Sequence, residues 1–289
     1  MLKTRIIGVV LVREGIAVQS IGFRQYLPIG TPEIAIGYLD RWGIDEIVVL
    51  EIDATASRRC PLADRIRSYA QQCQVPLSVG GGIAQVSDVE RIIRAGADKV
   101  VINSAIVTAP ETISEAARRF GTQCIVASID VRLEADGTRM AFTDSGVRPT
   151  GLTAQQLAQR AEGLGAGEIL ITSIDRDGSQ RGYDLELIQG VADVVRIPVI
   201  ACGGAGHPEH MRAAMRCGVS AVAAANFFHF TEHSVIIVKQ YLKSLGEPVR
   251  LDSHATYRSF RFKDAGRTGK RDDGVLEALR FHYVPEERI

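Results

Sequence analysis

The 289-residue sequence lacks several features that would assign it to a large class of proteins. It has no surplus charge of either sign, since 34 basic and 34 acidic residues give a formal net charge of zero. Nucleic acids and anionic membranes attract proteins with a basic surplus, so neither is predicted as a partner. Aromatic residues make up only 6% of the chain, but hydrophobic residues make up 46%, which is enough for a large core.

Cysteine motifs and long apolar runs are also missing. The five cysteines are an odd number without CxxC spacing, and the sequence predicts no metal site and no cofactor. No apolar run reaches the roughly 18 residues of a membrane-spanning helix. The apolar stretch near the N-terminus is too short for a secretory signal and is followed by no small-residue cleavage site. These features favour a cytoplasmic protein.

Short runs of β-branched residues alternate with amphipathic segments over residues 1–251. Eight runs have the length of strands: 5–12, 46–52, 75–81, 99–103, 124–130, 168–174, 197–204 and 219–227. Apolar strands separated by helices are typical of a parallel sheet covered by helices. Eight such units in roughly 250 residues predict a single α/β domain, a (β/α)₈ TIM barrel. Its helices are predicted to begin at capping or proline residues, namely Thr31, Ser87, Pro110 and Thr153.

One sequence pattern occurs twice at a fixed spacing along the chain. Residues 43–47 match residues 165–169, and at the same spacing Gly81-Gly82 matches Gly203-Gly204. Several matches at one spacing are hard to explain as coincidence between common residues of α/β proteins. We therefore predict that the barrel consists of two (βα)₄ halves.

Residues 252–289 fall outside this pattern and are predicted to form a C-terminal extension. Basic and aromatic residues alternate in it, and such a composition can bind nucleic acid. A solvated, flexible tail or an arm that docks on a partner protein is the better interpretation. A short helix over residues 275–284 is also compatible with the sequence.

Acidic residues end several predicted strands, where the reactive groups of such barrels are found. Asp130 ends an otherwise apolar strand, so its carboxylate is predicted to face the barrel mouth and to be catalytic, although it could instead cap the next turn. The corresponding position in the first half is Leu11. One half thus keeps an acid where the other half has a hydrocarbon side chain.

Glycine-rich turns follow the third and seventh predicted strands. Glycine leaves room for an anion to reach backbone N–H groups at the start of a helix. One turn in each half predicts two anion sites across the mouth, for a substrate with a phosphate at each end. The polar loop 175–184 is interpreted as a segment able to fold over a ligand, or as a plain connector. The candidate phosphate-binding residues are Gly81, Gly82, Asn103, Ser104, Asp177, Gly178, Gly203, Gly204 and Asn226.

Four charged residues begin four different predicted strands: Arg5, Glu46, Lys99 and Glu168. Charges that point into a barrel are costly unless they are paired. The two bases and two acids could close the floor of the barrel as a ring of ion pairs. They could equally face outward as an ordinary solvated rim, and spacing alone does not decide between these alternatives.

Together these motifs resemble the cyclase subunit of imidazole glycerol phosphate synthase over residues 1–251. The resemblance rests on VGGGI, ADKVVIN, ASID, GAGEILITSIDRDG and ACGGAGHPEH. It implies a barrel that forms a heterodimer with a glutaminase subunit and passes ammonia along its axis to a phosphorylated substrate. It also implies an ammonia gate and a glutaminase interface, formed respectively by Arg5, Glu46, Lys99 and Glu168, and by Asp98 and Gln123.

The mouth departs from the pattern of that family. The family uses two aspartates as general acid and base in ring closure; Asp130 matches one, and Leu11 replaces the other. A positioned acid or base typically contributes about 10²–10⁴-fold in rate, so ordinary cyclase activity is doubtful. Five further positions also differ, namely Val9, Gln19, Glu51, Cys202 and Asn226, where the family has Cys, Lys, Asp, Ser and Ser.

Divergent members with leucine at this position are similar to proteins of bacterial surface-polysaccharide gene clusters. Those proteins are linked to placing an amidino group on a nucleotide-activated sugar, together with a glutaminase and a sugar amidotransferase. This chemistry needs ammonia but no imidazole ring closure, so our first hypothesis is an ammonia-channelling synthase subunit outside histidine biosynthesis.

Two alternatives to this hypothesis stay open. One is an ordinary cyclase of histidine biosynthesis, in which Glu51 or Asp53 substitutes for the acid missing at Leu11. The other is a non-catalytic conduit that activates the glutaminase and passes ammonia to a third protein docked near residues 252–289. The acceptor substrate cannot be read from spacing, because altered loop residues change the shape of a pocket.

Overall fold

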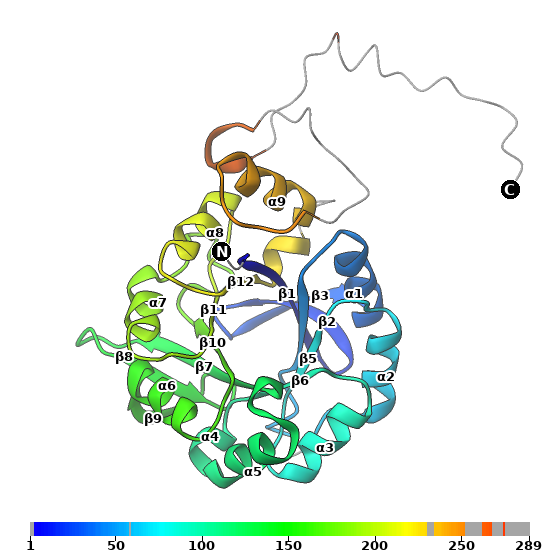
Figure 1. The fold of residues 1–289 in the computed structure, drawn as a ribbon, viewed down its shortest axis with the longest axis vertical. Helices are drawn as coiled ribbons and strands as arrows, with labels where there is room; N and C mark the ends of the chain where they lie inside the picture. The colour runs from blue at the N-terminus through cyan, green and yellow to red at the C-terminus, as the bar shows by residue number, and fades with distance from the viewer. Residues whose placement is uncertain (1–2, 58, 230–233, 252–261, 268–273, 275–289) are drawn as a thin grey trace, which may run out of the picture.

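The computed structural model describes residues 3–57, 59–229, 234–251, 262–267 and 274. Its centre is a closed barrel of eight parallel strands with helices around the outside (Figure 1). The barrel closes where β12 pairs with β1, with Ala221 opposite Arg5. In order, the barrel strands are β1 (Arg5–Arg13), β4 (Glu46–Glu51), β5 (Leu77–Gly80), β6 (Lys99–Ile102), β7 (Ile125–Leu133), β10 (Glu168–Ser173), β11 (Val199–Cys202) and β12 (Ala221–Ala224). The predicted (β/α)₈ fold and its eight strands are confirmed.

The helices begin close to the residues that the sequence indicated. Thr31 and Thr153 precede α1 and α6, and Pro110 opens α5. The predicted start at Ser87 is wrong, because the Asp88 carboxylate accepts the Gln85 N–H and so makes Gln85 the residue that precedes α3. The described helices are α1 (Pro32–Arg41), α2 (Ala63–Gln71), α3 (Val86–Arg94), α4 (Ala105–Thr108), α5 (Pro110–Phe120), α6 (Ala154–Gly163), α7 (Leu185–Ala192), α8 (Pro208–Met215) and α9 (Ser234–Ser244).

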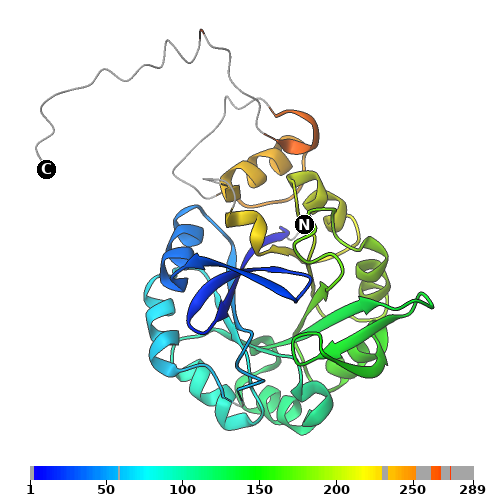
Figure 2. The ribbon, with the colours of Figure 1, turned by 180° about the vertical axis from the view of Figure 1, so that it is seen from behind.

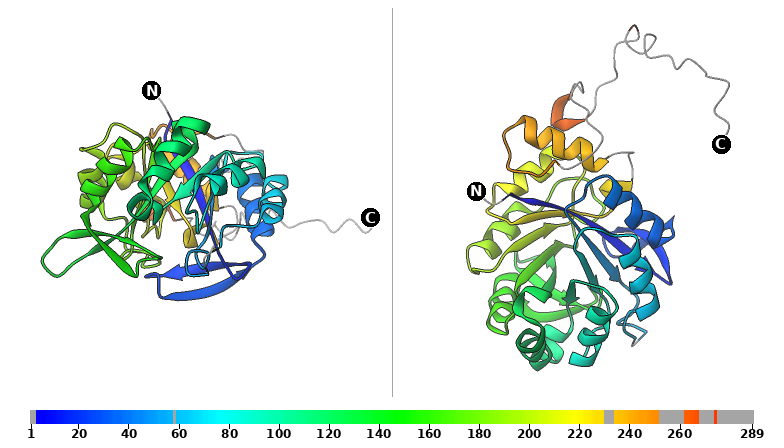
Figure 3. Two further views of the ribbon diagram at one scale, coloured as in Figure 1. Left: turned by 90° about the horizontal axis from the view of Figure 1, so that it is seen from below. Right: turned by 45° about the vertical axis from the view of Figure 1, so that its right-hand side comes forward.

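Two antiparallel hairpins were not predicted. One consists of β2 (Ile16–Ile21) and β3 (Gln25–Gly30) after β1, and the other of β8 (Arg139–Thr143) and β9 (Arg148–Thr153) after β7. They pair with the ends of those barrel strands, so that Leu11 lies opposite Val18 and Asp130 opposite Phe142. Both hairpins lie at the end of the barrel opposite the N-terminus (Figures 2 and 3). Because each follows the first strand of its half, the hairpins extend the twofold repeat of the chain.

The buried side chains form two separate clusters, one inside the barrel and one between the strands and the helices. Alternate residues of a strand point to opposite faces, so Ile7, Val9 and Leu11 of β1 fill the barrel while Ile6 and Val10 face the helices. The inner cluster separates the floor of the barrel from its mouth by several apolar side chains.

A buried ion pair fastens α9 to the barrel. The Lys239 Nζ lies 2.7 Å from Asp45 Oδ1, and the two side chains are only 3% and 4% exposed. The Lys239 ammonium also donates to the carbonyl of Gly43, and the second Asp45 oxygen accepts the Ile6 N–H at 2.7 Å. This network joins the last helix of the barrel to the starts of its first two strands.

The substitution Lys239→Met is expected to lower the free energy of unfolding by about 3–5 kcal/mol, because it leaves the Asp45 carboxylate buried without a cation. Urea unfolding followed by circular dichroism measures this change. Lys243→Met, on the exposed side of the same helix, is the matched control and should change stability by less than about 0.5 kcal/mol. Similar losses in both variants would contradict a specific role for the ion pair.

Only residues 262–267 and 274 of the C-terminal extension are described. Segment 262–267 lies against the barrel, with the Phe262 ring edge-on to Tyr241 at a centroid distance of 5.3 Å. The remaining residues, including the helix considered for 275–284, lie outside the described part of the chain. Within that part, no helix has the length and apolar character needed to cross a membrane.

Candidate functional site

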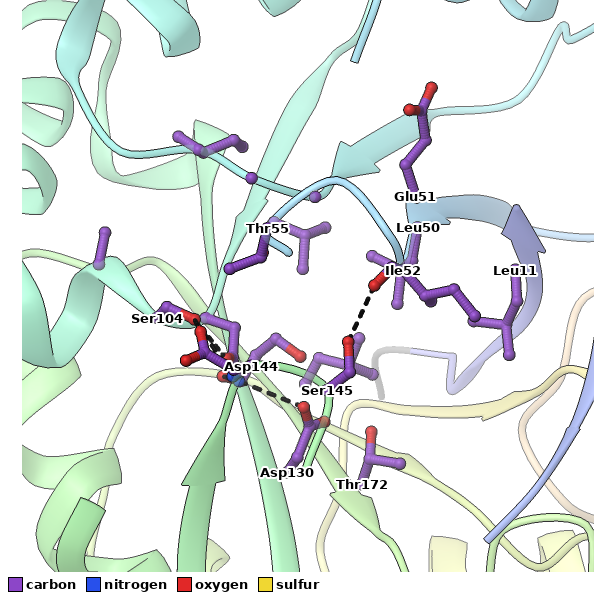
Figure 4. Close-up of a pocket in the computed structure, with 18 of the residues that line it drawn as sticks. Leu11, Leu50, Glu51, Ile52, Thr55, Ser104, Asp130, Asp144, Ser145 and Thr172 are labelled. Carbon is purple, nitrogen blue, oxygen red and sulfur yellow. Dashed lines mark hydrogen bonds between the residues drawn. The ribbon is translucent and has the colours of Figure 1, made fainter. Parts of the chain in front are cut away.

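A cavity of about 610 Å³ opens at the ends of the barrel strands. Leu11 and Asp130 both line it, as the sequence predicted for residues at the barrel mouth. Its apolar lining includes Leu11, Phe23, Tyr26, Leu50 and Ile52. Its polar lining includes Asn103, Ser104, Asp130, Asp144, Thr172 and Asp177, several of which are shown in Figure 4.

Asp130 has the properties of a proton donor and acceptor. Its Oδ2 lies 3.3 Å from the Asn103 side-chain nitrogen. Burial, followed by the nearby charge of Asp177, raises the pKa of Asp130 to about 7. A carboxyl group whose pKa is raised towards neutrality can both donate and accept a proton, which suits general acid–base chemistry. The alternative that Asp130 caps a turn is wrong, because β7 continues to Leu133 and no described backbone N–H donates to the carboxylate.

Leu11 is 9% exposed and belongs to the inner apolar cluster. Neither acid considered as its substitute lies beside it. The Glu51 carboxylate points away from Asp130 and Leu11 in Figure 4, and it pairs with Arg59. The reason is the alternation along β4, which turns Leu50 into the barrel and Glu51 out of it. Asp53 is likewise paired with Arg59, at 3.0 Å.

The first-half anion residues Gly81, Gly82, Asn103 and Ser104 line the cavity. A side chain at Gly82 would collide with the Arg59 carbonyl, and the φ of +59° also favours glycine. Close packing of the loop that carries Arg59 therefore requires glycine here, whether or not an anion binds. The Ser104 hydroxyl donates to Asp144 at 3.0 Å.

The second-half anion residues do not line the cavity, with the exception of Asp177. Asn226 is occupied by the hairpin β2–β3, since its Oδ1 accepts the Ser20 N–H at 3.2 Å and its Nδ2 donates to the Ser20 carbonyl at 2.6 Å. The Gly204 carbonyl accepts the Gly182 N–H at 2.8 Å. Loop 175–184 thus folds onto the glycine turn. The predicted second anion site, which includes Gly178, Gly203, Gly204 and Asn226, lies outside the lining of this cavity, and anion binding there stays a prediction.

Three arginines at the cavity were not predicted: Arg59, Arg91 and Arg148. Each is held by acidic neighbours, with Arg91 2.8 Å from Asp88 and Arg148 3.3 Å from Asp144. Arg59 lies in a loop, Arg91 in α3 and Arg148 at the start of β9, without a shared motif, so no pattern in the sequence brings them together. Arg59 and Arg91 belong to the first half of the barrel and Arg148 to the second, and each is a cation that an anionic substrate group in the cavity could contact.

The four charged strand-start residues form a closed ring at the opposite end of the barrel. Arg5 lies 2.6 Å from Glu46 and 2.9 Å from Glu168. Lys99 lies 3.1 Å from Glu46 and 2.9 Å from Glu168. Acids and bases therefore alternate, and each residue has two partners of opposite sign. The alternative of an outward-facing solvated rim is wrong.

Glu46 is the most deeply buried member of the ring, with its side chain only 1% exposed. It also accepts a hydrogen bond from the Ser78 hydroxyl at 2.9 Å. Asp98 and Gln123 lie just before β6 and β7, at the same end, and both are exposed. One carboxylate oxygen of Asp98 is occupied within the chain, because Oδ2 accepts the Leu77 N–H at 2.8 Å.

No group of three or more His, Cys, Asp and Glu side chains in the described segments is arranged to hold a metal ion. A comparison with models of protein families matches residues 5–234 to the family described as histidine biosynthesis protein. The match runs from the first strand of the barrel to the first residue of α9.

Proposed function

Since the chain belongs to the histidine biosynthesis protein family of barrel enzymes, we propose that it is an ammonia-using synthase subunit of a glutamine amidotransferase. A glutaminase subunit docks near Asp98 and Gln123 as the other half of a heterodimer and releases ammonia there. Ammonia passes the ring of Arg5, Glu46, Lys99 and Glu168 and crosses the barrel to the cavity. There it serves to amidate a nucleotide-activated sugar for surface polysaccharide, together with a sugar amidotransferase.

The contrast between the two ends of the barrel is the observation that supports this proposal. At the floor, the four charged residues form a complete ring of ion pairs. An apolar interior lies between this ring and the cavity. Neutral ammonia can cross such an interior, whereas an ammonium ion would lose its hydration at a high cost. At the mouth, Leu11 cannot move a proton, so the position that imidazole ring closure requires is not available.

The second candidate is the cyclase reaction of histidine biosynthesis itself. Family membership favours it, and so does the presence of a second cavity carboxylate, Asp177. The third candidate is a conduit that carries out no chemistry. It depends on the docking of another protein near residues 252–289, which the structure describes only in part.

Complementation separates the first two candidates. A strain that lacks its histidine-pathway cyclase and expresses this chain with its glutaminase is expected not to grow without histidine, because Leu11 removes a ring-closing acid. In parallel, adding the purified chain to the glutaminase is expected to stimulate glutamine hydrolysis. Growth without histidine at the rate of a strain with its own cyclase would contradict the proposal, as would an unstimulated glutaminase.

A further inference from the structure

We propose that Asp177 is a second proton-transferring carboxylate of the mouth and acts with Asp130 when ammonia attacks its acceptor. This inference rests on the proposed function, because it concerns the attack of ammonia in the same cavity. The two acids then come from β7 and from the loop after β10, both in the second half of the barrel. The sequence had assigned Asp177 to phosphate binding, and Asp177 is the member of that second-half set that lines the cavity.

Contacts from the hairpin β2–β3 fix the position of Asp177. Its Oδ2 accepts the Ser20 hydroxyl at 2.6 Å and the Phe23 N–H at 3.3 Å. Its backbone carbonyl accepts the Gly22 N–H at 3.1 Å. Among the described residues, no hydrogen bond involves Oδ1, and this oxygen is not buried without a partner. One carboxylate oxygen is therefore anchored, while the other is left for a ligand in the cavity that Asp177 lines.

The Asp130 and Asp177 side chains line the same cavity. Asp130 lies opposite Thr172 in the pairing of β7 with β10, and Asp177 follows the end of β10. Tyr26 lines the cavity, and burial followed by the charges of Asp177 and Asp130 raises its pKa, against the nearby Arg13 cation. Burial also raises the pKa of Cys202 to about 12, so this thiol does not compete as an acid or base near pH 7.

Both members of the pair have a raised pKa. Burial raises the pKa of Asp177 to about 6, while hydrogen bonds from the Ser20 hydroxyl and the Phe23 N–H lower it. Burial, followed by the charge of Asp177, raises the pKa of Asp130 to about 7. Each carboxyl group can therefore exchange a proton closer to neutral pH than an ordinary aspartate does.

The other acids at the cavity are already engaged. Asp144 accepts the Ser104 hydroxyl through Oδ1 and pairs with Arg148 through Oδ2. Glu51 pairs with Arg59 and points away from Asp130, and its other oxygen, Oε1, is buried without a partner. Asp88 holds Arg91 and the start of α3. Among the described acids that line the cavity, Asp130 and Asp177 are the two without an arginine partner.

The pair can complete the addition of ammonia to a carbonyl-type carbon. The new N–C bond forms while the C–O π bond breaks, which leaves a positive charge on nitrogen and a negative charge on oxygen. Asp177 accepts one proton from the nitrogen, and Asp130 gives its proton to the oxygen. All atoms and charges balance, and the proton has moved from one carboxyl group to the other.

Carbon-13 NMR of the full chain labelled at the aspartate carboxyl groups tests this pairing by pH titration. In Asp177→Asn, the pKa of Asp130 is expected to fall, because a negative neighbour that disfavours its ionised form is gone. The matched control is Asp175→Asn in the same loop, since Asp175 is exposed and accepts the Leu133 N–H at 2.8 Å. Asp175→Asn should leave the titration of Asp130 unchanged.

Ser20→Ala gives a second, milder test, and it applies even if Asp177→Asn does not fold. Removing a donor to the ionised carboxylate should raise the pKa of Asp177. An Asp130 titration that is the same in wild type and Asp177→Asn would overturn the pairing, and so would an Asp177 titration unmoved by Ser20→Ala. The measurement needs neither glutaminase nor acceptor, so its failure is distinct from failure of the proposed function.

Discussion

Asp130→Asn is expected to reduce the incorporation of glutamine-derived ammonia into product by about 10²–10⁴-fold, the usual contribution of a positioned acid or base. Asparagine keeps the shape of the side chain and its contact with Asn103, but it cannot transfer a proton at neutral pH. Nitrogen-15 from the glutamine amide, followed into product by mass spectrometry, measures the loss. Asp136→Asn, in the exposed turn between β7 and β8, is the matched control and should retain full turnover.

The same substitution is expected to stabilise the fold in alkaline solution, which separates loss of chemistry from loss of structure. The pKa of Asp130 is raised in the folded state, so the folded chain binds the proton more tightly than the unfolded chain does. The stability that this proton gives is complete below the ordinary aspartate pKa and is lost as pH rises through about 7. Asp130→Asn should therefore unfold at higher urea than wild type at pH 8, with a smaller advantage at pH 5. If Asp130→Asn showed undiminished incorporation of ammonia into product, a role for Asp130 in the mechanism would be contradicted.

Glu46→Gln is expected to have the second largest effect, on both stability and ammonia delivery. Arg5 and Lys99 would be left to share the single carboxylate of Glu168. Breaking a buried ion pair by removing one partner typically costs about 3–5 kcal/mol, which urea unfolding would measure. Glu115→Gln, which removes a half-exposed surface carboxylate, is the control and should change stability by less than about 0.5 kcal/mol.

Delivery through the floor is tested by comparing two nitrogen sources in the Glu46→Gln variant. Turnover with glutamine should fall by roughly tenfold or more, the factor that corresponds to about 1.4 kcal/mol of barrier. Turnover with an added ammonium salt should change little, because ammonia from solution reaches the cavity through its open mouth. Equal losses with both sources would contradict a role for the ring in passing ammonia.

The elements that carry strong apolar patterns were predictable from the sequence. The barrel strands have continuous β-branched runs because both of their faces are buried. The hairpin strand β3 escaped notice because most of its residues are exposed, so no apolar period marks it. The contacts of Asn226 were missed for the same reason. Glycines matched between the halves could not reveal that the Asn226 side chain bonds to the Ser20 backbone.

The sequence by itself determined which side chains point into the barrel and in what order they follow its axis. Side chains alternate along a strand, so the order of residues from Arg5 to Leu11 already places a charge at one end and a hydrocarbon at the other. Only the tertiary structure decided which groups meet across the chain. Ser20 contacts Asp177 and Asn226 at separations of 157 and 206 residues, and Lys239 reaches Asp45 across 194. Such contacts depend on closure of the barrel and docking of the hairpin, which no local pattern of residues specifies.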